Sequence, residues 1–287
     1  MNKTITEKEL DSLLNFVGYG RLDADIWFLG MEESAANLKT IRDRQKFQQV
    51  EDSLEAQNIL GLSPNQFEYE NLQNAWSGMS EIMLRLEEKP VTPENLHKYR
   101  QESLGRSDGS TLLCEFLPLP MPAGTDWAYE SLLPDYPSRE AYIEWLKPLR
   151  FELFRELVNQ NLPKVIICFG RQAWPVYQEL FKDFKLSPNG DFEMGWQTDT
   201  VVILCDHLAG EAMQGKLEDL LRLILENCLA IDTAKPSGPI PLSKTELARQ
   251  KKEAARQMAA AKRKPTTKHN PADPYCVCAY CLGYEND

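Results

Sequence analysis

The sequence lacks the apolar run of about 20 residues that a membrane-spanning helix needs, and its charged first 16 residues do not resemble a signal peptide. Cysteine is sparse and uneven: there are seven, and three fall within residues 276–281. This excludes a disulfide scaffold. No glycine-rich phosphate loop with its lysine is present, which argues against a P-loop kinase or a dinucleotide enzyme. These absences predict a cytoplasmic protein that does not bind membranes.

Basic residues are scarce over most of the chain and concentrated near its end. The net charge is −11 over 287 residues. Residues 1–242 carry 23 basic and 38 acidic side chains, a net charge of −15, whereas residues 243–270 carry nine basic and two acidic ones, a net charge of +7. We therefore expect an acidic body with a basic arm suited to a polyanion.

Four continuous apolar runs predict buried parallel strands, because strands covered on both faces lack polar alternation. They are residues 25–30, 111–117, 164–170 and 201–205. Helix-length stretches separate them, at residues 70–87, 138–159 and 171–184, and another follows at 215–229. This alternation predicts a three-layer α/β/α sandwich around a central, mostly parallel four-stranded sheet.

Three parts are expected along the chain. Residues 1–232 form the α/β/α domain, which opens with a short helix behind a capping box of Thr6 and Glu9 and breaks at residues 18–20. Residues 233–242 are a linker rich in proline and glycine. Residues 243–287 are a basic helical extension with a cysteine-rich end. We expect a monomer.

Functional side chains follow two of the predicted strands. The first strand leads into Gly30, Met31, Glu32 and Glu33, and the fourth leads into His207. Because ligands bind at the carboxyl ends of parallel strands, an acid and an imidazole there make a plausible acid/base pair. A solvated turn would explain the two acids equally well, since acids favour the start of a helix.

The residues around these ends resemble the uracil-DNA glycosylase superfamily. The resemblance is carried by residues 26–30 with an acid soon after, by residues 163–173, and by the strand that ends at His207. It covers roughly residues 17–230. In that family the first motif positions water or stabilises the sugar cation, and the histidine bonds the departing base. The resemblance therefore implies that Glu32, or Glu33 beside it, holds the catalytic carboxylate position and His207 the histidine position, with no cofactor for catalysis.

Two departures from the family pattern affect the expected substrate. Glu115 stands where the family has an asparagine that reads the pyrimidine edge, and Leu208 replaces the proline after the histidine. An ionised carboxylate accepts hydrogen bonds but does not donate them, which suits the exocyclic amine of a cytosine-type base. We therefore expect a DNA glycosylase for a modified pyrimidine, such as the hydroxymethylated or glucosylated cytosine of phage DNA, that acts in base-excision repair or antiphage defence.

Base flipping needs a stacking face and a wedge. Phe116 or Phe47 is expected to stack on the base, and Leu208 is expected to serve as the wedge. Core packing is the competing explanation for these side chains. Phosphate contacts are expected from the basic arm, through Lys251, Lys252, Arg256, Lys262, Arg263 and Lys264.

The tail carries Cys276, Cys278 and Cys281 within six residues, and His269 would complete a tetrahedral structural zinc site. A reactive tail without metal is the alternative. Two other functions also stay open for the whole chain: an inactive nucleic-acid-binding protein of the same fold, and a metal-dependent nucleotide hydrolase that uses Glu32 and Glu33.

Overall fold

The computed structural model of the chain describes residues 5–33, 41–61, 74–121, 127, 129–209, 211–213 and 215–227. The chain divides into two compact units, Met1–Ile240 and Pro241–Asp287, and the described residues all belong to the first. The predicted linker, basic helix and cysteine-rich tail lie outside them. No helix in the described part of the chain combines the length and the apolar composition needed to cross a membrane.

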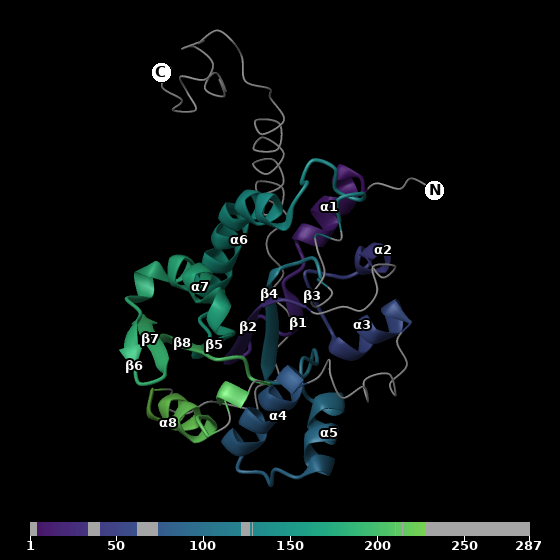
Figure 1. Cartoon of the computed structure of the whole chain (residues 1–287). Helices are drawn as coiled ribbons and strands as arrows, with labels where there is room; N and C mark the ends of the chain where they lie inside the picture. The colour runs from purple at the N-terminus through teal and green to yellow at the C-terminus, as the bar shows by residue number, and fades with distance from the viewer. Residues whose placement is uncertain are drawn as a thin grey trace, which may run out of the picture. The chain divides into compact units, whose positions relative to one another are not determined.

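The first unit is built on one eight-stranded sheet with the strand order β3-β1-β4-β2-β5-β8-β7-β6 (Figure 1). The strands are β1 (Gly18–Gly20), β2 (Ile26–Glu32), β3 (Val50–Glu51), β4 (Thr111–Leu117), β5 (Val165–Phe169), β6 (Ser187–Asn189), β7 (Phe192–Gln197) and β8 (Thr200–Cys205).

The four predicted strands are confirmed as β4, β2, β5 and β8, which pair in parallel in that order at the centre of the sheet. All residues of β5 and β8 are buried, as are the first five residues of β2. Burial on both faces explains why these strands appear in the sequence as continuous apolar runs.

The expected four-stranded sheet is wrong in size, because four further strands extend it at both edges. β1, β3 and β6 have only two or three residues and β7 has six, and three of the pairings of these strands are antiparallel, so the whole sheet is mixed. Residues 18–20 were expected to be a break, but they form β1. A Cβ atom on Gly18 would overlap the carbonyl oxygen of Leu113, so glycine here permits a close approach of two strands.

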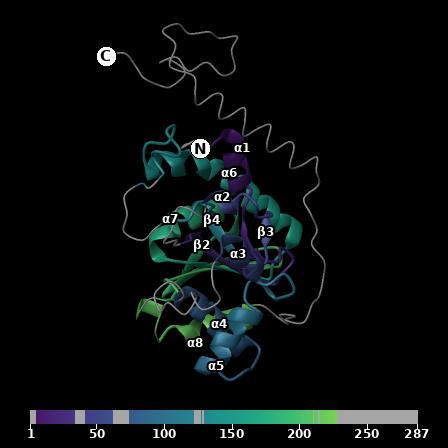
Figure 2. The same cartoon turned by 90° about the vertical axis from the view of Figure 1, so that its right-hand side faces the viewer.

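Helices cover both faces of the sheet (Figures 1 and 2). α4, α5 and α8 lie on one face and α6 and α7 on the other, which confirms the α/β/α arrangement. The α-helices are α1 (Glu7–Leu14), α2 (Ile41–Arg44), α3 (Ser53–Leu60), α4 (Asn74–Leu86), α5 (Pro93–Glu102), α6 (Arg139–Asn161), α7 (Trp174–Leu180) and α8 (Leu217–Asn227).

The predicted capping box is confirmed at the start of α1. The backbone N–H of Glu9 donates to the Thr6 hydroxyl at 3.3 Å, and the Glu9 carboxylate accepts from the Thr6 N–H at 2.7 Å. Two of the N–H groups at the start of the helix are thereby satisfied, which fixes where the helix begins.

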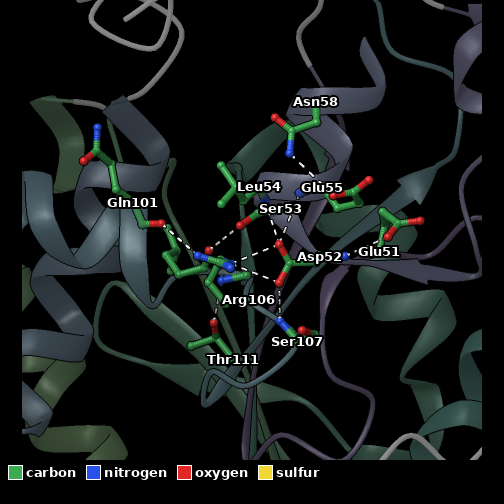
Figure 3. A network of polar contacts seen from close by, with 12 residues as sticks. Glu51, Asp52, Ser53, Leu54, Glu55, Asn58, Gln101, Arg106, Ser107 and Thr111 are labelled. Carbon is green, nitrogen blue, oxygen red and sulfur yellow. Dashed lines mark hydrogen bonds and ion pairs between the residues drawn. The ribbon is translucent and has the colours of Figure 1, made fainter. Parts of the chain in front are cut away.

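Asp52 joins the start of α3 to the loop before β4 (Figure 3). Its carboxylate accepts from the backbone N–H groups of Leu54 and Glu55, from the N–H of Ser107, and from Nε of Arg106 at 2.9 Å. Burial opposes ionisation of Asp52, but the bonds from Ser107 and Arg106 outweigh it and lower its pKa. This network holds the β3–α3 corner against the central sheet.

We expect Asp52→Asn to lower the free energy of unfolding by about 1–2 kcal/mol at pH 7, because the charged acceptor of four hydrogen bonds is lost. A carboxyl whose pKa is lowered in the folded state stabilises it above the unfolded pKa. That contribution disappears as the pH falls through the folded pKa. The difference between the two proteins, measured by chemical denaturation, should therefore shrink at acidic pH. Asp43→Asn, which breaks an exposed ion pair with Lys46, is the control and should change little. Equal losses at pH 7 and at acidic pH would contradict the assigned role of the Asp52 charge.

Candidate functional site

The carboxyl ends of the four parallel strands lie along one edge of the sheet. β4 lies on one side of β2 and the next strand, β5, lies on the other, so the strand order reverses at β2. Ligands of open α/β sheets bind outside the carboxyl ends of the strands at such a reversal. A binding site is therefore expected at the residues that end β2 and its neighbours.

A row of three residues crosses the sheet at this edge. Gly30 of β2 pairs with Glu115 of β4 on one side and lies beside Phe169 of β5 on the other. A Cβ atom on Gly30 would lie 2.8 Å from Oε2 of Glu115 and 2.8 Å from Cζ of Phe169. The missing side chain of Gly30 therefore lets a carboxyl group and an aromatic ring approach each other over the strand.

His207 follows β8 by two residues and extends this row. Its exposed ring lies edge-on to Phe169, with 5.7 Å between ring centroids and an interplanar angle of 77°. The N–H of Ala209 donates to Nδ1 of His207 at 3.3 Å, which assigns the proton of the neutral ring to Nε2. Partial burial lowers the pKa of His207, so the ring is neutral at pH 7 and presents Nε2–H as a donor.

Glu32 and Glu33 at the end of β2 have different partners. Oε1 of Glu32 accepts from Arg139 at 2.7 Å, while its Oε2 is buried and has no hydrogen-bond partner among the described residues. Glu33 accepts from the buried Arg44 at 2.7 Å and from the hydroxyl of Tyr19 at 3.0 Å. Glu33 is thus anchored by two donors, whereas Glu32 is held at one oxygen alone within the described part of the chain.

Glu115 has the most strongly perturbed of the three carboxyl groups. Its Oε2 is buried and has no hydrogen-bond partner within the described part of the chain. Burial raises the pKa of Glu115 well above its usual range, and the negative charges of Glu33 and Glu32 raise it further, against the opposing charges of Arg44 and Arg150. This combination of burial and like charge is typical of functional carboxyl groups.

Arg150 of α6 fixes the end of β4 from beneath. It is 1% exposed, and its guanidinium donates at 2.7–2.9 Å to the carbonyl oxygens of Leu14, Phe16, Glu115 and Phe116. Burial lowers its pKa to about 10, so it stays charged. Sequence reasoning missed this residue, although its place next to Phe151 within a predicted helix is unusual for a solvated cation.

The structure corrects three of the expected substrate contacts, because the side chains are buried in the core. Phe116 is 0% exposed and packs against Phe151 and Phe154 of α6, since alternation along β4 turns it to the face opposite Glu115. Phe47 packs between Phe16 and Tyr19.

Leu208 is 8% exposed and lies against Gly78 of α4, so it is not placed as a wedge. Met31, in contrast, is partly exposed beside Gly30 at the edge.

The expected zinc and phosphate ligands lie outside the described residues and stay predictions. They are His269, Cys276, Cys278 and Cys281, and Lys251, Lys252, Arg256, Lys262, Arg263 and Lys264. Cys114, Cys168 and Cys205 are buried free thiols in the core.

Sequence reasoning also missed the ion pairs of Asp206, the residue before His207. Asp206 accepts from Nε of Arg171 at 2.8 Å and from Nζ of Lys216 at 3.0 Å. Burial opposes ionisation of Asp206, but these two bonds outweigh it and lower its pKa. An acid directly before His207 in the sequence could have drawn attention to Asp206. Its partners Arg171 and Lys216 come from other segments, so the sequence did not identify them.

Comparison of the sequence with known proteins finds no matching family model and no matching curated protein. The function is therefore argued from the geometry of the site.

We expect Gly30→Ala to destabilise the protein by about 1–3 kcal/mol, because the new methyl group displaces the Glu115 carboxyl or the Phe169 ring. The NMR signals of the His207 ring should shift with Phe169, while those of His97 stay in place. Gly61→Ala is the control: its φ of +64° makes alanine unfavourable, but nothing lies near the added atom. Unchanged His207 signals in Gly30→Ala would contradict the coupling across the row.

Proposed function

We propose that this chain is a DNA glycosylase that hydrolyses the N-glycosidic bond of a modified pyrimidine. One observation carries the proposal. The carboxylates that end β2 and the Nε2–H donor of His207 lie at the same edge of the parallel sheet: the carboxylates follow Gly30 on β2, and His207 lies beyond Phe169 after β8. The resemblance of the strand-end segments to the uracil-DNA glycosylase superfamily supports the same assignment.

The reaction needs groups of opposite character at two places. As the glycosidic bond breaks, positive charge develops on the sugar, as in glycoside hydrolysis, and negative charge develops on the departing base. A carboxylate stabilises the sugar cation and orients water, while a hydrogen-bond donor stabilises the base anion. Glu32 and His207 supply these two groups.

Glu32 suits the role of water-directing base better than Glu33. Oε2 of Glu32 has no hydrogen-bond partner in the described region, so a water molecule or the sugar would displace none there; because this oxygen is buried, DNA binding must first uncover it. Arg139 holds the other oxygen at 2.7 Å, which orients the group. Glu33 is engaged by Arg44 and Tyr19 and stabilises the start of the loop after β2.

The base would be recognised by Glu115, after the nucleotide swings out of the helix. A modified cytosine of phage DNA is the substrate we propose, which would make the protein an antiphage enzyme; repair of a damaged pyrimidine is the other biological role of the same chemistry.

Contact with DNA must overcome the electrostatic repulsion between the phosphates and the net charge of −15 on residues 1–242. We propose that the basic segment at residues 243–270 binds phosphates and that the cysteine-rich end is held by structural zinc. The thiolates and His269 have the donor chemistry that zinc prefers.

One observation favours a second function. Glu32 and Glu33 are both ion-paired within the protein, so neither carboxylate is without a protein partner, which favours an inactive nucleic-acid-binding protein of the same fold. A metal-dependent nucleotide hydrolase gains no such support, because no three His, Cys, Asp or Glu side chains of the described residues are grouped to hold a metal ion.

We expect Glu32→Gln to slow base release by about 10²–10⁴-fold while DNA binding is kept, because the amide no longer orients water or offsets the sugar cation. The full-length protein is incubated with DNA containing uracil, cytosine, 5-hydroxymethylcytosine or its glucosylated form, and released bases are identified by mass spectrometry. Glu152→Gln, at an exposed position of α6, is the control and should keep wild-type rates. DNA binding without release of any base would favour the inactive binding protein.

A further inference from the structure

Three carboxyl groups lie near the ends of β2 and β4, but among the described residues only two of them have a cationic partner. Glu32 pairs with Arg139 at 2.7 Å, and Glu33 pairs with Arg44 at 2.7 Å. For Glu115 no ion pair is present among the described residues, and its Oε2 is buried without a partner. Glu115 is therefore the carboxyl group with the least support for a negative charge.

The cations nearest to Glu115 are already engaged. Arg44 of α2 donates to Glu33 and lies within 3.4 Å of the Tyr19 hydroxyl. Arg150 of α6 directs its guanidinium at four backbone carbonyl oxygens, one of which belongs to Glu115 itself. These cations lower the cost of a charge on Glu115 but do not bind its carboxyl group.

We propose that Glu115 keeps its proton at neutral pH and binds the edge of a flipped pyrimidine as a neutral carboxylic acid, with one donor and one acceptor. This inference rests on the proposed function for the identity of the ligand. It departs from the sequence-based expectation that Glu115 acts as an acceptor alone. Its position beside Gly30 and the Phe169 ring, at the reversal of strand order, places it where a ligand is expected.

A neutral carboxyl group has a consequence for specificity. With its proton on one oxygen, it complements the ring nitrogen acceptor and the amine donor of a cytosine-type base. With the proton on the other oxygen, it complements the N–H donor and carbonyl acceptor of a uracil-type base. Glu115 therefore recognises pyrimidines as a class, and discrimination among them comes from other contacts.

The charges around Glu115 fix the sign of its effect on stability. Burial and the carboxylates of Glu33 and Glu32 raise its pKa, and Arg44 and Arg150 oppose the rise without cancelling it. A carboxyl whose folded pKa is raised binds a proton on folding at any pH between the unfolded and folded values. Stability is therefore lost as the pH rises above the unfolded pKa, and the loss continues up to the folded pKa.

The experiment compares the melting temperatures of the full-length wild type and Glu115→Gln between pH 5 and pH 9. Glutamine has nearly the same shape and needs no proton, so its advantage in Tm should grow by about 3–5 °C per pH unit until the folded pKa is reached. Glu152→Gln should show a Tm difference that is independent of pH. A Tm difference for Glu115→Gln that is also constant over this range would overturn the proposal.

Two further measurements do not depend on melting. The carbonyl-stretch band of a protonated carboxylic acid should be present in the infrared spectrum of the wild type at pH 7 and lost in Glu115→Gln; its absence from the wild type would overturn the proposal. Base release by the wild type should fall at alkaline pH, whereas release by Glu115→Gln should not. The expected Tm trend without release of any base would contradict the proposed function and the role of Glu115 in base binding, but not its protonation.

Discussion

The candidate site depends on the parallel register that β2 shares with β4 and β5. This register sets Gly30 opposite Glu115 and beside Phe169, and the missing side chain of Gly30 brings the carboxyl group and the ring together. A shift of one residue in β2 would turn Gly30 to the other face and separate all three. The continuous burial of the central strands is what fixes the register, so the packing of the core determines the chemistry at the edge.

Charge is divided unequally among the carboxyl groups at this edge. Glu32 and Glu33 form ion pairs with arginines from α6 and α2. Glu115 has no ion pair among the described residues, and burial and the neighbouring negative charges raise its pKa. The buried Arg150 allows this arrangement by binding the backbone of β4, where it adds positive charge without forming an ion pair with Glu115. Three chemically identical side chains therefore lie in three different electrostatic environments, which fit the three roles that we propose for them.

The sequence predicted the central sheet and the common edge of Glu32 and His207, because continuous apolar runs identify buried parallel strands and the chain order places their ends together. It did not predict the four added strands: β1, β3 and β6 have only two or three residues, and β7, with six, mixes buried and exposed positions and contains a glycine. It also placed Phe116 and Leu208 in the site, because apolar residues next to a functional residue can face either the ligand or the core. Burial decides between these, and burial depends on contacts with α6 and α4, which are remote in the sequence.

The central claim is that a flipped base binds along the row at the carboxyl edge of the sheet. The most direct test is a crystal structure of Glu32→Gln bound to DNA that carries the released pyrimidine, or the glucosylated cytosine if none is released. We predict an extrahelical base whose hydrogen-bonding edge contacts Glu115 and which lies near Phe169. A carbonyl oxygen of this base should be within hydrogen-bond distance of Nε2 of His207. DNA bound elsewhere on the protein, with no base at this edge, would contradict it.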